Sequence, residues 1–460
     1  MGLPPCWLTN RICSFTVIVT GRMPIGYDLF YPREEAGMNK TKMHNTAEML
    51  LLILCLGAVV AVVLWLFIRI VSLGSMLVWE TIPEKTNLSW IVIPLCAAGG
   101  CVTGVIHKKF GDYPEELPVV LGKVKRDKHY DYHPMLVMLV CALLPLIFGS
   151  SVGPEAGLTG IIAGLCYWIG DNVTFARHHA ALCSEIGEAV TLGQLFHSPL
   201  FGILAVEEEP MEEGKPPAMP KLLKLVFYGL SIVAAFLVLA LLNKLFHTSA
   251  AGFPSFSEVS IHPSDYALVL LYIPVGIALY LIFEKAEKYM GFAANFVPVI
   301  LRETLCGVVI GLMGLIVPMV IFSGEEEMAE LMDTFGSYTP FLLICVSLLK
   351  IVMTAFCLKF GMKGGHFFPL IFACCCMGFG LAMLFFPDAG SHVVFAAGVV
   401  TSATLGAQLK KPLAVSVLML LCFPARLLFW IFLAAALGGK LAEFLKKVLH
   451  SEKNSDTQKT

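Results

Sequence analysis

The sequence is poor in charged residues. Only 14% of its 460 residues are Asp, Glu, Lys or Arg, whereas a soluble domain carries about 25%. Hydrophobic residues make up 57% of the chain, which excludes an ordinary soluble domain and indicates a polytopic membrane protein in a lipid bilayer. The formal net charge is −2, and the sequence has no basic cluster with interleaved aromatic residues, so nothing in it favours nucleic-acid binding.

The sequence also lacks the residue patterns of enzymes and metalloproteins. Its 15 cysteines lie mostly within apolar runs and without the paired spacing of a zinc site, which is typical of buried, inert thiols. His178, His179, Glu185 and Glu188 lie in or near apolar stretches without a set of metal ligands at i, i+4. No catalytic triad or nucleotide-binding loop is present. We therefore expect no enzymatic activity, no cofactor and no metal site.

Apolar runs fill most of the chain after residue 44. The first long run extends from Met49 to Leu73, and Lys40 and Lys42 precede it. Residues 1–44 read as an N-terminal extension, either disordered or upstream of the true start. Many of the later runs are close to or below the roughly 20 residues that a membrane span needs, which predicts half-helices or steeply tilted helices. These runs cover residues 88–106, 133–149, 156–170, 178–206, 222–244, 265–283, 302–322, 339–358, 366–386, 392–407 and 412–438.

Basic residues at both ends predict the topology. Lys40 and Lys42 precede the first span, and Lys440, Lys446 and Lys447 follow the last. Positively charged flanks stay on the cytoplasmic side of a membrane. Both termini are therefore predicted to be cytoplasmic, with residues 441–460 forming a short C-terminal helix and tail.

The two halves of the chain carry corresponding breaks. Leu192-Gly193 and Pro199-Leu200 in the first half match Leu405-Gly406 and Pro412-Leu413 in the second, at the same spacing. A Gly- and Pro-containing helix start precedes each pair. Such correspondence is typical of an inverted-repeat transporter. It predicts two membrane repeats, at residues 45–221 and 222–440.

Both helix starts have the composition of an anion site. Gly149-Ser150-Ser151-Val152-Gly153-Pro154-Glu155 supplies flexible backbone and then a proline, which suits the first turn of a helix. Gly364-Gly365-His366-Phe367-Phe368-Pro369 is its counterpart. A helix N-terminus carries about half a positive charge and free N–H groups. We predict that the backbone N–H groups of Gly153 and Phe367 share one anion site, with Gly365 and His366 beside it.

These motifs resemble those of the CLC chloride channel and proton/chloride transporter family, and the resemblance covers about residues 45–445. Gly364 to Pro369 resembles the family's G-x-F-x-P loop, and Ser198 to Glu209 resembles its N-A-P-L-x-G-x-x-F-x-x-E-E segment. Ser323-Gly324-Glu325 and Gly438-Gly439-Lys440 follow in the family's order. The resemblance implies an all-helical inverted-repeat fold with tilted and broken helices. It also implies conduction of an inorganic anion such as chloride and a homodimer, with the plasma (inner) membrane as the expected location.

The sequence departs from the family at positions that the family uses for function. Val152 stands where the G-R-E-G-P motif has its gating glutamate, and Glu155 follows three positions later, nearly one helical turn away. Gly111 stands at the anion-binding serine of the G-S-G-I-P loop. The inner-gate tyrosine aligns with Glu443, next to Phe444. By resemblance, Glu209 matches the internal proton-transfer glutamate and Glu208 matches its neighbour.

Several interpretations stay open on the sequence alone. Glu155 is either a movable gate and proton carrier or a cap of its helix, and Glu208 and Glu209 either transfer protons or lie in a solvated loop. His366 is either an anion ligand or a partner of a backbone carbonyl, and Phe367 is either a donor or a packing residue. Glu325, Glu326 and Glu327 are expected to face water in a loop. The alternatives to anion transport are a secondary transporter of a cation or an organic acid, and a non-transporting remnant such as an intramembrane enzyme or assembly factor.

Overall fold

The computed structural model describes residues 40–115, 119–120, 123, 126–127, 129–172, 180–196, 198–207, 221–248, 255–256, 259 and 261–457. The expected extension 1–44 lies outside this range except for residues 40–44, which open the first described helix. Glu208 and Glu209 also lie outside the described residues. The chain divides into two units at Met49 and Leu50, and the packing described below is that of the unit beginning at Leu50.

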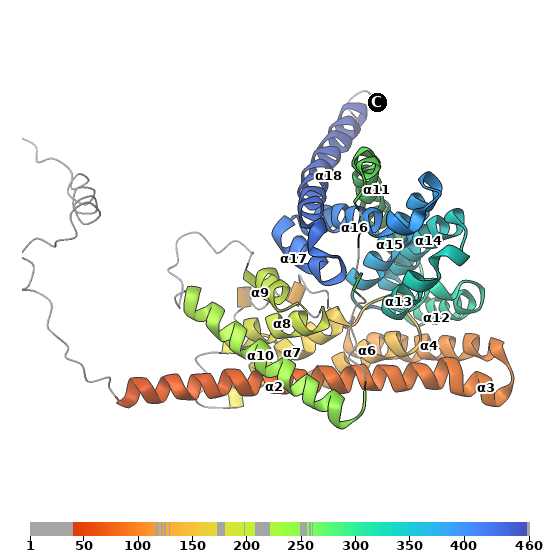
Figure 1. The fold of residues 1–460 in the computed structure, drawn as a ribbon. Coiled ribbons are helices and arrows are strands. Elements are labelled where there is room, and N and C mark those ends of the chain that lie inside the picture. The colour runs from red at the N-terminus through yellow and green to blue at the C-terminus, as the bar shows by residue number, and fades with distance from the viewer. Residues whose placement is uncertain are drawn as a thin grey trace, which may run out of the picture. The chain divides into compact units, whose positions relative to one another are not determined.

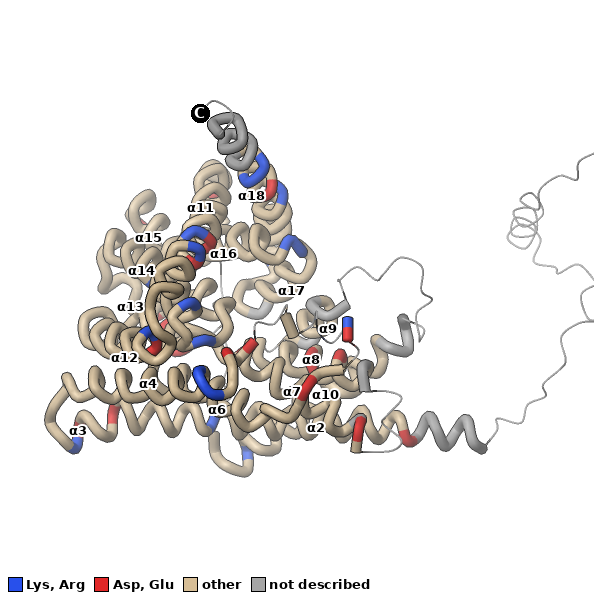
Figure 2. Tube along the Cα trace, turned by 180° about the vertical axis from the view of Figure 1, so that it is seen from behind, with Lys and Arg blue, Asp and Glu red and all other residues tan. Residues whose placement is uncertain are grey.

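The described part is built from α-helices (Figure 1), so the predicted all-α class is confirmed. Eight of these helices are long and apolar enough to cross a membrane. Figure 2 shows long stretches of helix that carry no charged residue. The helices are α2 (Lys40–Met76), α3 (Ile82–Thr86), α4 (Val92–Phe110), α6 (Met135–Ile147), α7 (Glu155–Asn172), α8 (Ala180–Leu195), α9 (Pro199–Glu207), α10 (Lys221–Leu245), α11 (Pro263–Ala294), α12 (Val299–Ile316), α13 (Glu325–Thr334), α14 (Pro340–Lys359), α15 (Phe367–Phe385), α16 (Val393–Leu409), α17 (Pro412–Cys422) and α18 (Leu428–Thr457).

Several apolar runs are broken, as the short spans predict. The run 178–206 divides into α8 and α9, and the run 412–438 divides into α17 and α18. Pro199 and Pro412 are the first residues of α9 and α17, a position where the missing N–H of proline costs no hydrogen bond. Other apolar helical segments are shorter, among them Met135–Ile147, the apolar part of α7 at Glu155–Ile169, and Val393–Leu409. At 1.5 Å per residue they are too short to cross the hydrocarbon core.

Small residues let two helix pairs approach closely. A methyl group added to Gly100 of α4 would lie 2.1 Å from the carbonyl oxygen of Glu303 in α12. One added to Gly406 of α16 would lie 2.2 Å from the carbonyl oxygen of Ala435 in α18. Close backbone approach through small residues is the usual way in which helices associate inside a membrane, where apolar side chains gain little from leaving lipid.

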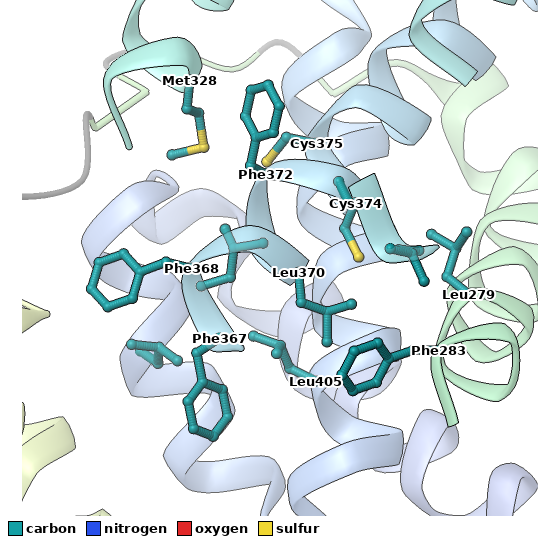
Figure 3. Close-up of a cluster of buried hydrophobic side chains, with 14 of the residues drawn as sticks. Leu279, Phe283, Met328, Phe367, Phe368, Leu370, Phe372, Cys374, Cys375 and Leu405 are labelled. Atoms are coloured by element: carbon teal, nitrogen blue, oxygen red, sulfur yellow. The ribbon is translucent and has the colours of Figure 1, made fainter. Parts of the chain in front are cut away.

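Helix α15 lies at the centre of the second half. Its most apolar window is 83% buried, and it packs against α14 and α16. Figure 3 shows Phe368, Leu370 and Phe372 of α15 in a cluster of buried side chains that includes Leu405 of α16. The N-terminus of α15 is therefore enclosed by protein, which is the setting in which irregular backbone is tolerated at membrane depth.

Helix α18 continues past the predicted boundary between the second repeat and the C-terminal segment. It runs from Leu428 to Thr457 without interruption at residues 440–441. Gly438 and Gly439 lie inside this helix, and Gly438 packs against the carbonyl oxygen of Ala403. The two glycines thus serve close packing here instead of ending a helix.

Candidate functional site

Two breaks between helices meet in the interior of the protein. One lies between α6 and α7, and the other lies between α14 and α15. The Gly153 N–H donates to the Gly365 carbonyl and the Gly365 N–H donates to the Gly153 carbonyl, each at 2.7 Å. Because Phe367 follows Gly365 by two residues, Gly153 and Phe367 lie close together, as a shared site requires. Helices α7 and α15 both begin from this point.

The carboxylate of Glu155 lies at the N-terminus of α15. Its side chain is buried, and Oε1 accepts a hydrogen bond of 2.9 Å from the backbone N–H of Phe367. Oε2 has no hydrogen-bond partner among the described residues. The N-terminus of a helix stabilises a negative charge. The Glu155 carboxylate thus accepts the hydrogen bond from the backbone N–H at which the sequence predicts a bound anion.

Glycine residues border this carboxylate on both sides. A methyl group on Gly365 would lie 1.8 Å from Cδ of Glu155, and one on Gly153 would lie 2.1 Å from its Oε2. Real carbon atoms in contact are about 3.5–4.0 Å apart. The carboxylate therefore lies directly against the backbone of the two paired loops.

The predicted role of Gly153 as an anion donor needs correction. Its N–H is already donated to the Gly365 carbonyl, because a buried backbone N–H is almost always paired and the antiparallel loops supply a partner. Gly153 therefore holds the two loops together in this structure, and Phe367 supplies the donor to the carboxylate.

Val152 is buried and borders the second loop. A methyl group on Gly364 would lie 2.5 Å from Cγ2 of Val152, so the valine fills the space beside the paired backbones. Two neighbouring serines fix its loop. Ser150 Oγ donates to the Met362 carbonyl at 2.8 Å, and Ser151 Oγ lies 3.1 Å from Oγ1 of Thr354. Position 152, at which the sequence resemblance expects a gating glutamate, is thus apolar and tightly packed.

His366 precedes α15 as its N-cap residue. Its ring is hydrogen-bonded to the side-chain amide of Gln408. Ring centroids of His366 and Phe367 are 4.8 Å apart, and those of His366 and Phe283 are 5.6 Å apart. The imidazole is therefore held between the end of α16 and two aromatic rings.

Gly111 and Phe444 lie apart from the Glu155 carboxylate. Gly111 is exposed at the end of α4, with φ of 109°. Its neighbour Asp112 forms an ion pair of 2.5 Å with Lys363, two residues before Gly365, so the Gly111 loop borders the second break. Burial alone would raise the pKa of the Asp112 carboxyl, but Lys363, with smaller contributions from other nearby cations, lowers it below the ordinary value. Phe444 is 62% exposed on α18, which does not fit a gate in a closed constriction.

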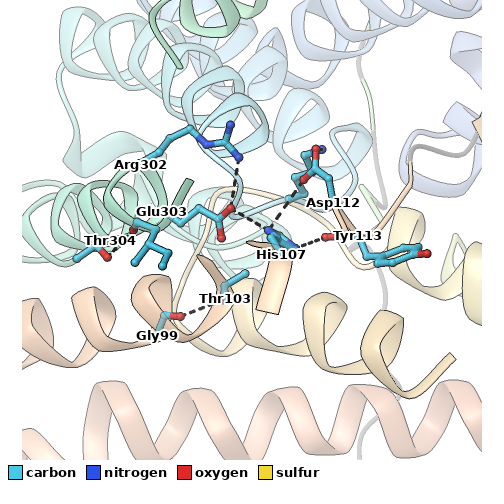
Figure 4. Close-up of polar contacts among 10 residues, drawn as sticks. Gly99, Thr103, His107, Asp112, Tyr113, Arg302, Glu303 and Thr304 are labelled. Carbon is cyan, nitrogen blue, oxygen red and sulfur yellow. Dashed lines mark hydrogen bonds and ion pairs between the residues drawn. The ribbon is translucent and has the colours of Figure 1, made fainter. Parts of the chain in front are cut away.

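A buried polar network, shown in Figure 4, joins α4 and α12 to the segment that follows α4. Nδ1 of His107 lies 2.8 Å from Oε1 of Glu303, and both side chains are almost fully buried. A nitrogen of Arg302 lies 3.3 Å from the same carboxylate oxygen, and the other ring nitrogen of His107 lies 2.5 Å from the Tyr113 carbonyl. Sequence reasoning missed this network. Its only signal was a glutamate within the apolar run 302–322, since ionisable groups inside membrane segments are usually paired.

The acidic segment Glu325 to Glu327 was wrongly expected to be a loop, although Glu326 is exposed as expected. It forms the first turn of α13, after Gly324 with φ of 95°. Glu325 is half-buried. Burial, followed by repulsion from Glu155 and the two neighbouring glutamates, raises the pKa of Glu325 to about 8. A favourable N-terminal position for acidic residues explains the helix, while the surrounding helices explain the burial.

The broken helices and the buried carboxylate define the class of protein to which this chain belongs. The chain is a multi-pass integral membrane protein in which two broken helices begin at one buried point, and a carboxylate lies at the N-terminus of one of them, as in anion channels and transporters. The family model for the voltage gated chloride channel matches residues 99–443. The chain therefore belongs to the voltage gated chloride channel family, and it is an anion channel or transporter of the CLC type.

Relatives and solved structures agree with this assignment. The voltage-gated ClC-type chloride channel ClcB of Shigella boydii serotype 18 is 25% identical over 368 residues, which cover 77% of this chain and 83% of the relative. The ClcB protein of Escherichia coli O9:H4 is 24% identical with the same coverage. A slow cyanobacterial Cl−/H+ antiporter has a TM-score of 0.69 at 17% identity, covering 88% of this chain and 98% of the other. A CLC-type fluoride/proton antiporter has a TM-score of 0.67 at 18% identity, covering 86% and 95%. The inverted-repeat fold is thus confirmed.

Proposed function

We propose that the protein carries a small inorganic anion of the chloride type through the position that the Glu155 carboxylate now holds. The observation that supports this most directly is the 2.9 Å hydrogen bond from the Phe367 N–H to Glu155. An anion that enters must take over this donor, because the free N–H groups of a helix N-terminus replace hydration for a negative charge. The names of the relatives, chloride channels, and of the structural neighbours, which exchange chloride or fluoride for protons, point to the same substrate class.

We propose further that Glu155 is the gate. The family position for this role is the apolar Val152, whereas Glu155 reaches the same helix start from one turn further on. When Glu155 is charged it competes with the anion for the Phe367 N–H. When it is protonated it loses most of its attraction to the helix N-terminus and can leave. Transport would then depend on pH through this residue.

The test is anion flux in proteoliposomes, measured with chloride, nitrate and fluoride between pH 4.5 and 8. Glu155→Gln should retain flux and lose its pH dependence, because glutamine keeps the shape and cannot ionise. Glu188→Gln is the matched control, since Glu188 is also a buried glutamate in a neighbouring apolar helix. It should keep the pH dependence of the unchanged protein.

Two results would contradict the proposal in different ways. Unchanged pH dependence in Glu155→Gln would make Glu155 a helix cap and the protein an uncoupled channel. Absence of flux for all three anions in the unchanged protein, with folding verified by size-exclusion chromatography, would reject anion transport itself.

We also propose a homodimer in the plasma (inner) membrane with both termini cytoplasmic. The family resemblance supports the dimer, and the lysines Lys440, Lys446 and Lys447 support the orientation of the C-terminus. Light scattering of the purified protein tests the dimer. Accessibility of terminal tags in sealed vesicles tests the orientation, and tags on opposite sides would reject it.

A further inference from the structure

A cavity of about 380 Å³ adjoins the Glu155 site. Residues of α2 and α10, the ends of α6 and α8 and the start of α13 line it. Pro154, the neighbour of Glu155 in the chain, is among the lining residues. Cavities of 300–1,000 Å³ are the usual size for small organic ligands. The proposed gating by Glu155 does not involve the other side chains that line this cavity.

The charges around the cavity favour a cation. Three glutamates, namely Glu80, Glu326 and Glu327, line it against one arginine, Arg69. A fourth, Glu325, also lines it but is neutral at pH 7, because its pKa is raised to about 8. The guanidinium of Arg69 lies over the ring of Trp65, at 5.7 Å from its centroid. An excess of carboxylates at close range attracts cations and repels anions. The cavity therefore does not favour binding of the transported anion, because its negative charge repels anions.

The apolar lining favours an organic cation over a bare metal ion. Trp65, Phe67, Trp79 and Phe322 all border the cavity, and Trp79 and Phe322 pack edge to face with centroids 5.4 Å apart. Aromatic faces attract ammonium groups. In the described part of the chain, no three His, Cys, Asp or Glu side chains are grouped closely enough to hold a metal ion.

A buried amide points into this space without a partner. Gln194, at the end of α8, lines the cavity and is only 1% exposed. Neither its Nε2 nor its Oε1 forms a hydrogen bond with any described residue. An unsatisfied buried polar group costs about 1–3 kcal/mol, so a bound molecule that offers it a hydrogen bond would remove that cost. A ligand that carries an N–H donor would satisfy Oε1.

We propose that this cavity binds a small organic primary ammonium ion. Its N–H groups bond to Oε1 of Gln194 and to the carboxylates at the start of α13, and its apolar body lies against Trp65 and Trp79. The ion arrives from water, because Glu80 and Glu326 at the cavity are exposed and α13 is not one of the apolar spans. This inference concerns binding and stands independently of the anion that is transported.

Benzylammonium is the probe, titrated calorimetrically into the full-length protein in detergent. It should bind at least tenfold more tightly than the neutral analogue benzyl alcohol. Benzyltrimethylammonium keeps the charge but has no N–H, and it should bind about 5- to 10-fold more weakly than benzylammonium. Equal affinity for benzylammonium and benzyl alcohol would overturn the proposal.

Variants test the assigned contacts. The double variant Glu326→Gln/Glu327→Gln should weaken benzylammonium binding about tenfold or more, and Gln194→Leu should abolish the preference for the primary over the quaternary ammonium. Glu330→Gln is the matched control, because Glu330 is an exposed glutamate of the same helix that does not line the cavity. The affinity of this variant for benzylammonium should stay within twofold of that of the unchanged protein. Because Glu327 is half-buried, thermal unfolding of the double variant in detergent checks that it is folded before its affinity is measured. Unchanged affinity in the double variant would reject the site.

Discussion

Replacing Gly365 by alanine tests whether the Glu155 carboxylate and the transported anion use one position. The added methyl group would lie 2.0 Å from Oε1 of Glu155 and 1.8 Å from its Cδ. The protein should still fold, because the atoms in the way belong to the end of a flexible side chain and Gly365 does not adopt a positive φ. The methyl group then displaces the carboxylate and takes up the place in front of the Phe367 N–H.

The size of the effect follows from the lost contact. An anion placed where Oε1 now lies would need about 3.5 Å or more from a methyl carbon, and the alanine leaves 2.0 Å. Loss of a hydrogen bond to a charged group costs about 1.5–3 kcal/mol, which is about a 10- to 150-fold loss of anion affinity. Gly365→Ala should therefore reduce flux by at least tenfold.

The assay is chloride flux in proteoliposomes, with anion affinity from calorimetry. The decisive comparison uses the Glu155→Ala background, in which no carboxylate competes. If the two positions coincide, Gly365→Ala blocks flux in that background too. Equal flux in Glu155→Ala and in Glu155→Ala/Gly365→Ala would refute a shared position.

Two further predictions concern stability, read from thermal unfolding in detergent. Because the pKa of Glu325 is raised from 4.5 to about 8, the folded state holds its proton while the unfolded state releases it, so stability falls as pH rises from about 4.5 to 8. Glu325→Gln should raise Tm at pH 8 and leave it unchanged below pH 4.5, and an equal effect at both pH values would contradict this. Glu303→Ala should destabilise by about 3–5 kcal/mol, because it leaves His107 buried without its carboxylate. His107→Ala/Glu303→Ala should be less destabilised than the sum of the two single variants, and strict additivity would show that the pair does not interact.

The sequence predicts the helix breaks well because their causes are local. Proline is the first residue of α9 and α17, and Gly153-Pro154 directly precedes α7, so these starts are marked without reference to the rest of the fold. The correspondence of the two halves then brings Pro154 and Phe367 toward one site. These arguments rest on spacing along the chain, which the sequence contains in full.

What the sequence could not predict depends on contacts across the fold. The sequence predicts the N–H of Gly153 to be a free donor, whereas in the structure it is bonded to the Gly365 carbonyl. The sequence predicts Glu325 to be a loop residue, whereas in the structure it lines a cavity. The inner-gate tyrosine aligns with Glu443, next to Phe444, but α18 continues as one helix and leaves the Phe444 ring exposed. For Gly153 and Glu325, the residues that decide the outcome are remote in sequence.

The proposal that Glu155 takes the role expected at position 152 can be tested by moving the carboxylate to position 152. Val152 is buried beside Gly364 and one residue before the paired Gly153, so a glutamate there starts within reach of the same helix N-terminus. In Val152→Glu alone, two carboxylates would compete for one Phe367 N–H, and like charges at short range oppose each other. Flux should therefore fall.

In Val152→Glu/Glu155→Gln, one carboxylate remains and the pH dependence lost in Glu155→Gln should return. Val152→Gln/Glu155→Gln is the matched control, because it adds a side chain of the same size without a titratable group, and it should stay insensitive to pH. Flux that remains insensitive to pH in the glutamate variant, with a normal Tm, would mean that the start of α15 is open only to a carboxylate that arrives from the first turn of α7. The first turn of α7, and not position 152, would then determine where a gating carboxylate can be placed.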